Sequence, residues 1–136
     1  MNQSQASTIL VVDDDPDHRS LIRHVLERNR FIVHQASDGF QGVALAQQIE
    51  PDLIVMDLSM PVLDGQIAAE QIRRDSKLGN IPIIFISAFG SKGMELFAGI
   101  DSLGSGPIEY LPKPLGDLDR LVELANDLLN HKKPTA

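Results

Sequence analysis

The chain contains no cysteine among its 136 residues. Disulfide bonds and cysteine-ligated metal sites are therefore excluded, and the composition is typical of the reducing cytoplasm, where we expect the protein to reside. No apolar run approaches the roughly eighteen residues of a membrane-spanning helix. Met1–Ser7 is polar and lacks the basic segment and apolar stretch of a secretory signal. We therefore expect no association with a membrane.

Positive charge is also scarce, with 12 Lys and Arg against 19 Asp and Glu and a formal net charge of −7. This surface would repel the phosphates of nucleic acid, so we expect no direct binding to DNA. Hydrophobic residues make up 43% of the chain, which is typical of one globular core and not of a disordered tail. We expect a flexible N-terminus over residues 1–7, one domain over residues 8–130 and a C-terminal tail over residues 131–136.

Short apolar segments alternate along the chain with segments of helical periodicity. The predicted strands are Thr8–Val12, Phe31–Ala36, Leu53–Met56, Ile83–Ile86 and Ile108–Leu111. Predicted helices begin at Pro16 (capped by Asp15), near Phe40, near Ile67, near Ser91 and at Leu118. In the second of these, Phe40, Val43, Ala44 and Gln47 recur at helical spacing. The alternation predicts an α/β fold with a parallel sheet covered by helices on both faces.

Polar side chains stand where the predicted strands end. They are Asp13–Asp15 after the first strand, Asp57 after the third, Ser87 after the fourth and Lys113 soon after the fifth. Ligands of parallel sheets bind beyond these ends. Clustered carboxylates repel one another and call for a cation, and oxygen ligands suit Mg²⁺. Carboxylate, Mg²⁺, lysine and hydroxyl together are what phosphoryl transfer to an aspartate requires.

The order of these segments resembles the receiver domain of bacterial two-component response regulators over essentially the whole chain. The resemblance is carried by Ile9–Pro16, Pro51–Asp57, Met60-Pro61 with Asp64-Gly65, Ser87-Ala88 and Tyr110–Pro114. It implies a flavodoxin-like, doubly wound, five-stranded parallel sheet in the order 2-1-3-4-5, with helices on both faces. It also implies that residues 8–130 form the receiver domain.

The resemblance further implies that Asp57 accepts a phosphoryl group from a histidine kinase and that the domain then changes conformation. Asp14 and Asp57 would bind Mg²⁺ directly, together with the main-chain carbonyl of Ser59, and Asp13 would act through a metal-bound water. The expected partners are a sensor histidine kinase or phosphotransfer protein, a downstream effector or an output domain, and a second copy of the chain. Beyond its own phosphorylation and dephosphorylation, no enzymatic activity is expected.

The remaining roles concern the response to phosphorylation. Lys113 would pair with Asp57 and then with a phosphoryl oxygen. The hydroxyl of Ser87 would move toward the phosphoryl group, and the ring of Tyr110 would change rotamer in step with it. The Lys113–Pro114 peptide would be cis, which X–Pro bonds adopt at low cost.

Each of these positions also has a simpler interpretation. Asp57 could end a strand and start a turn, and Asp13 and Asp14 could be a solvated run of charge. Ser87 and Tyr110 could be ordinary packing residues. The four histidines, His18, His24, His34 and His131, show no spacing typical of metal ligands.

Two alternatives of a different kind remain. One is a receiver-like scaffold that is never phosphorylated, although every pocket position holds a competent residue type. The other is a phosphatase, because Asp13-x-Asp15 followed by a later serine and lysine also resembles haloacid-dehalogenase-type enzymes, with Asp13 as nucleophile. That family needs a further acidic pair at a strand end, and the chain offers only Asp117 and Asp119 on or beside the last helix. It also leaves the motif at Asp57 unexplained.

Half of the ten glycines fall between Gly90 and Gly106. Each interior glycine costs a helix about 1 kcal/mol relative to alanine, so the helix predicted near Ser91 is weak. We expect this stretch to open readily and to change most on phosphorylation, because it connects Ser87 with Tyr110.

Overall fold

The computed structural model describes residues 6–58, 65–87, 106–112 and 118–132. Its strands are β1 (Thr8–Val12), β2 (Ile32–Ala36), β3 (Leu53–Asp57), β4 (Ile83–Ser87) and β5 (Ile108–Pro112). Its helices are α1 (Pro16–Arg28), α2 (Gly39–Ile49), α3 (Gly65–Arg74) and α5 (Leu118–Lys132). The helix predicted near Ser91, and the glycine-rich stretch that contains it, lie outside the described residues apart from Gly106.

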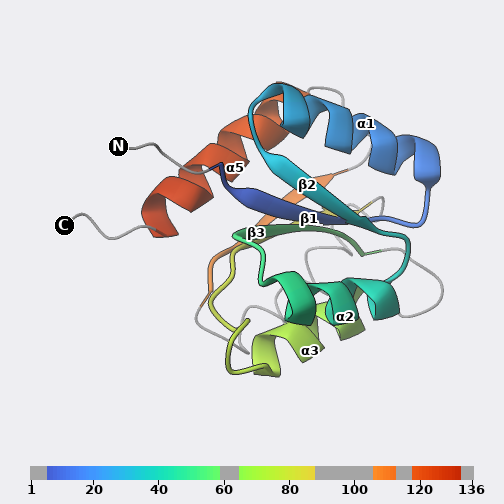
Figure 1. The fold of residues 1–136 in the computed structure, drawn as a ribbon, viewed down its shortest axis with the longest axis vertical. Helices are drawn as coiled ribbons and strands as arrows, with labels where there is room; N and C mark the ends of the chain where they lie inside the picture. Colours follow the sequence, from blue (N-terminus) through green and yellow to red (C-terminus); the bar gives the residue numbers. More distant parts are fainter. Residues whose placement is uncertain (1–5, 59–64, 88–105, 113–117, 133–136) are drawn as a thin grey trace.

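The five strands form one parallel sheet in the order β2-β1-β3-β4-β5, which confirms the predicted order. In Figure 1, α1 and α5 cover one face of the sheet and α2 and α3 cover the other. Strand β1 shows why helices must cover both faces of the sheet, because its successive apolar side chains point to opposite faces. Leu10 and Val12 pack in the core beneath α2 and α3, whereas Ile9 and Val11 pack beneath α1 and α5.

Helix α1 begins where the sequence indicates. The carboxylate of Asp15 accepts the backbone N–H groups of Asp17 and His18 at 3.0 and 3.4 Å, and Pro16 occupies the first turn. A capping carboxylate satisfies donors that the first turn leaves without a helical partner. This cap sets the position of the first turn of α1 relative to the end of β1.

Helix α2 exists as predicted, but its spacing pattern did not identify its buried face. Phe40 is 70% exposed, while Val43 and Ala46 are buried. The cause is Gly42, on which an added Cβ atom would lie 2.9 Å from a methyl carbon of Val12. A glycine at this position lets α2 approach β1 closely and turns Phe40 toward solvent.

Within the described residues, no helix is long and apolar enough to cross a membrane.

Candidate metal centre at the ends of the strands

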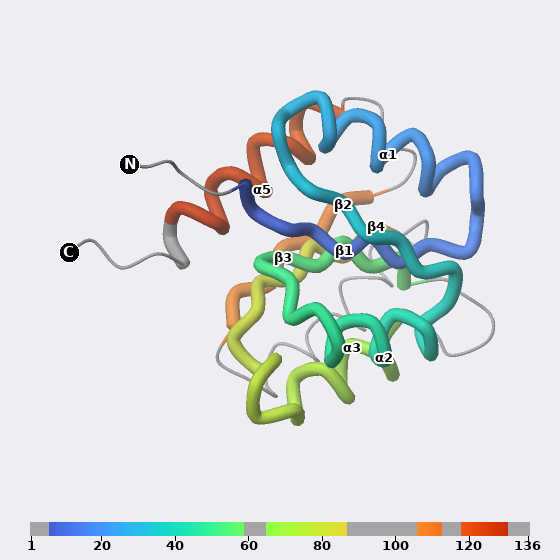
Figure 2. The backbone as a smooth tube through the Cα atoms, viewed as in Figure 1, coloured from blue at the N-terminus to red at the C-terminus, as the bar shows by residue number. Residues whose placement is uncertain are grey.

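Three carboxylates meet at the carboxyl ends of β1 and β3. Asp13 and Asp14 follow directly on β1, and Asp57 is the last residue of β3. The two strands are neighbours, with Val12 paired to Met56, so the sheet register brings these ends together (Figure 2). One carboxylate oxygen from each aspartate lies within 4.8 Å of the others. The predicted grouping of Asp13, Asp14 and Asp57 is therefore present in the fold.

The three carboxylates differ in their exposure to water. Asp13 and Asp57 are 1% and 2% exposed, whereas Asp14 is exposed. Burial raises the pKa of Asp13 above its usual value, hydrogen bonds from His18 and from the backbone of Asp15 lower it in part, and the charge of Asp57 raises it further. A divalent cation would relieve this repulsion. An all-oxygen donor set that opens to solvent on one side fits Mg²⁺, which keeps several waters.

Hydrogen bonds reach both the main chain and the carboxylate of Asp13. Its backbone N–H donates to the carbonyl of Ala36 at 3.1 Å, and its own carbonyl accepts from Nη1 of Arg19 at 2.7 Å. Its Oδ1 accepts from the backbone N–H of Asp15 at 2.9 Å, and its Oδ2 is bonded to Nδ1 of His18. Both the main chain and the carboxylate of Asp13 are therefore fixed.

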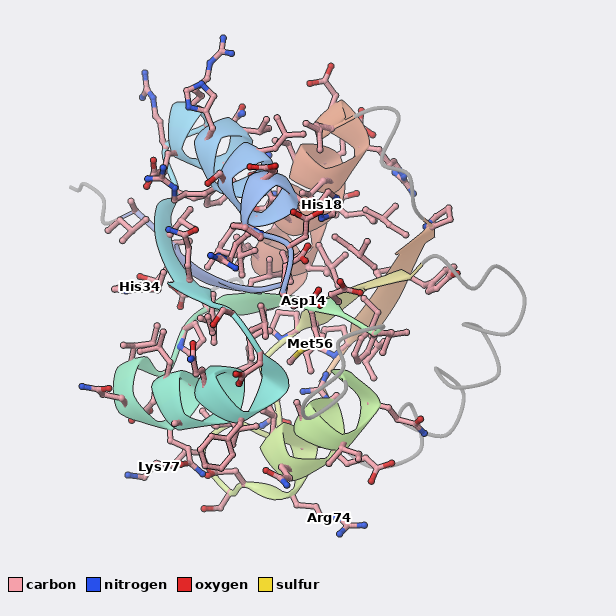
Figure 3. The ribbon with its side chains drawn as sticks, turned by 90° about the vertical axis from the view of Figure 1, so that its right-hand side faces the viewer. Asp14, His18, His34, Met56, Arg74 and Lys77 are labelled. Carbon is pink, nitrogen blue, oxygen red and sulfur yellow. The ribbon has the colours of Figure 1, made fainter. Side chains whose placement is uncertain are left out.

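The contact between His18 and Asp13 was not predicted from the sequence. His18 lies in the first turn of α1. Figure 3 shows it at the end of the helix that follows Asp14. Asp15 caps the helix, so His18 falls in the first turn, next to the end of β1.

Helix α3 begins directly against the backbone of Asp57. A Cβ atom added to Gly65 would lie 2.1 Å from the carbonyl oxygen of Asp57 and 2.8 Å from the Cα of Leu58. No side chain can be accommodated at such a distance. Gly65, predicted only as part of a loop, thus allows α3 to support the end of β3.

The neighbouring strands bring further predicted residues to this edge. Ile86 of β4 pairs with Asp57 and accepts the N–H of Leu58 at 2.9 Å, so the backbone of Ser87 lies beside the end of β3. The side chain of Ser87 is outside the described residues, as are Ser59, Lys113 and Pro114. Tyr110 of β5 pairs with Phe85 and packs, partly buried, against the core on the side of α2 and α3.

Of the two acidic residues that the chain offers to the phosphatase alternative, the structure describes one. Asp119 lies in the first turn of α5, not at the end of a strand. Asp117 is outside the described residues.

Comparison with known proteins identifies a family over most of the chain. The family model described as the response regulator receiver domain matches residues 9–126. The chemotaxis protein CheY of Bacillus subtilis is 35% identical over 126 residues, which cover 92% of this chain and 99% of CheY. The receiver domain of the sensor histidine kinase PA1611 of Pseudomonas aeruginosa, solved with a magnesium ion in its active site cleft, superposes with a TM-score of 0.80 at 29% identity and covers 92% of this chain and 98% of its own.

Other relatives are longer than this chain. The transcriptional regulator RpaA of Synechocystis is 37% identical over 121 residues, which cover 89% of this chain and 48% of RpaA. Three further relatives are matched over between 8% and 36% of their length.

Proposed function

This chain belongs to the response regulator receiver domain family, a family of two-component signalling, and we propose that its Asp57 accepts a phosphoryl group in the presence of Mg²⁺. Phosphorylation would switch the conformation of a domain that spans residues 8–130. The observation that carries the proposal is the grouping of Asp13, Asp14 and Asp57 within 4.8 Å, with Asp57 buried at the end of β3.

The metal would be held by the residues that crowd this edge. Asp14 and Asp57 would bind Mg²⁺ directly, with the main-chain carbonyl of Ser59, and Asp13 would act through a bound water. When bound, Mg²⁺ neutralises charge on the transferring phosphoryl oxygens. The magnesium ion in the active site cleft of the PA1611 receiver domain supports this assignment.

The bond that forms in the transfer joins Asp57 to the phosphorus of the donor. A carboxylate oxygen of Asp57 forms a bond to the phosphorus of a phosphohistidine while the phosphorus–nitrogen bond breaks. The departing imidazole nitrogen keeps the electron pair, and Asp57 becomes an acyl phosphate. Gly65 and the pairing with Ile86 fix the end of β3, so the nucleophile is positioned before the donor arrives.

The other roles concern the response. Lys113 would pair with Asp57 and then with a phosphoryl oxygen, next to a cis peptide at Pro114. The hydroxyl of Ser87 would move toward the phosphoryl group, supported by the backbone position of Ser87 beside the end of β3. Tyr110 would follow that movement, and its partly buried ring lies one strand away.

The proposed partners follow from the same chemistry. A sensor histidine kinase or phosphotransfer protein would supply the phosphoryl group in the cytoplasm. A downstream effector, an output domain or a second copy of the chain would read the switched state. We propose no catalytic activity other than self-phosphorylation and dephosphorylation.

Phosphoryl uptake can be measured by intact mass. With Mg²⁺ and acetyl phosphate, the wild-type chain should gain one phosphoryl group, and Asp57→Asn should gain none. Asp52→Asn is the matched control, because it removes a negative charge just before the opposite end of the same strand and keeps a side-chain oxygen for the N–H of Thr8, and it should behave as wild type. Full uptake by Asp57→Asn would contradict the proposal.

A further inference from the structure

We propose that His18 is a positioning residue, which holds the carboxylate of Asp13 in the orientation that Mg²⁺ binding requires and thereby sets the affinity of the site for the metal. The inference rests on the proposed function, because it assigns Asp13 to the metal centre. It goes further by giving a role to a residue outside the acidic cluster.

The first observation is the hydrogen bond between Nδ1 of His18 and Oδ2 of Asp13. An ionised carboxylate can only accept hydrogen bonds, so the ring nitrogen is the donor. The two side chains are 18% and 2% exposed, so the contact is largely shielded from water. A shielded bond of a donor to a charged acceptor is stronger than an exposed one.

The second observation is that the backbone carrying the ring of His18 is itself held in place. The backbone N–H of His18 donates to the capping carboxylate of Asp15 at 3.4 Å, which fixes the first turn of α1. The next residue, Arg19, donates to the carbonyl of Asp13 at 2.7 Å. The turn that carries His18 is therefore tied to the same residue that the ring contacts.

The third observation is that the two oxygens of Asp13 are held from different directions. Oδ1 accepts the N–H of Asp15 at 2.9 Å, and Oδ2 accepts from His18. Two such bonds prevent rotation of the carboxylate about its last bond. A carboxylate has about four lone-pair sites, so two remain available to a metal ion or its water.

These contacts favour metal binding because they fix the direction of the lone pairs that remain free on the carboxylate of Asp13. Loss of a partner that orients a ligand typically costs 10–100-fold in metal affinity.

Isothermal titration of the full chain with Mg²⁺ tests the inference. His18→Leu removes the donor at similar volume and should weaken Mg²⁺ binding about tenfold. His18→Asn places an amide N–H near the position of Nδ1 and should recover most of that loss. His24→Leu, at an exposed histidine of the same helix, is the matched control and should bind as wild type.

A second measurement follows the carboxylate directly. The amide proton of Asp15, which donates to Oδ1 of Asp13, should shift in the NMR spectrum of His18→Leu and return toward its wild-type position in His18→Asn. The inference is overturned if His18→Leu binds Mg²⁺ as tightly as wild type, or if His18→Asn binds no better than His18→Leu. Absence of Mg²⁺ binding by the wild-type chain would instead overturn the proposed function, and this inference with it.

Discussion

At the scale of single residues, the central feature is the cost of keeping Asp13 ionised inside the protein. Its side chain is almost fully buried and lies beside Asp57. Its carboxylate accepts hydrogen bonds from the backbone of Asp15 and from His18, whereas the guanidinium of Arg19 bonds to its main-chain carbonyl and not to the carboxylate. A bound cation would therefore stabilise the folded chain, because it would bind only where these carboxylates are assembled.

We predict that Asp13→Asn stabilises the metal-free protein near neutral pH. Burial raises the pKa of Asp13 in the folded state, so the folded chain binds this proton more tightly than the unfolded chain. Stability therefore falls as pH rises from the unfolded pKa through the folded one, and Asn avoids that loss.

Urea unfolding in a chelator, at several pH values, measures the effect. The advantage of Asp13→Asn should be full at neutral pH and should vanish below about pH 4, where the unfolded aspartic acid is also protonated. Asp127→Asn, at an exposed carboxylate of α5, controls for the loss of one charge. A difference between Asp13→Asn and wild type that does not depend on pH would contradict the account.

The sequence alone identified Asp13, Asp14 and Asp57, because the ends of parallel strands meet at one edge and all three aspartates stand at such ends. It could not identify His18. That contact depends on how the first turn of α1 is oriented, and a histidine on a helix offers no periodic signal.

At the scale of elements, the buried side chain of Arg73 joins α3 to the segments that lead into the sheet. Arg73 is 4% exposed, and its guanidinium donates to the carbonyls of Gly79, Ile81 and Pro107 at 3.2, 2.6 and 3.2 Å. An added Cβ atom on Gly106 would lie 2.8 Å from both terminal nitrogens of Arg73. Gly106 therefore leaves room for the guanidinium. The guanidinium links the end of α3 to the residues that precede β4 and β5.

We predict that Arg73→Met lowers the free energy of unfolding by about 3 kcal/mol, because it leaves three carbonyls without their donor. Arg74→Met is the matched control, since Arg74 is the exposed neighbour on the same helix, and its effect should stay within about 0.5 kcal/mol. Urea denaturation measures both. Equal effects of the two substitutions would show that the buried contacts of Arg73 contribute little.

Helix starts were predictable where the sequence carries a cap, as at Asp15 before Pro16. The buried face of α2 was not, because Gly42 buries no side chain and yet determines how closely the helix approaches Val12. The burial of Arg73 was also not predictable from the sequence. Arginine is usually exposed, and one of its partners, Pro107, lies 34 residues away in the sequence.

At the scale of the whole molecule, two properties of the sequence determine the architecture. Apolar strands alternate with helices, which requires a parallel sheet covered on both faces, and the strands end in polar residues. The order of the strands came from the resemblance and is confirmed by the sheet. The hydrophobic pattern is compatible with β2 and β5, the two more polar strands, at the edges of the sheet, but it does not order the three apolar strands between them.

The central claim is that Asp57, and not Asp13, is the nucleophile. The chain is phosphorylated with acetyl phosphate and Mg²⁺ and then treated with borohydride, which reduces an aspartyl phosphate to homoserine. Tandem mass spectrometry of the peptides locates the modified residue. The account predicts homoserine at position 57 and unmodified aspartate at position 13. Homoserine at position 13 with aspartate retained at position 57 would contradict it and support the phosphatase alternative.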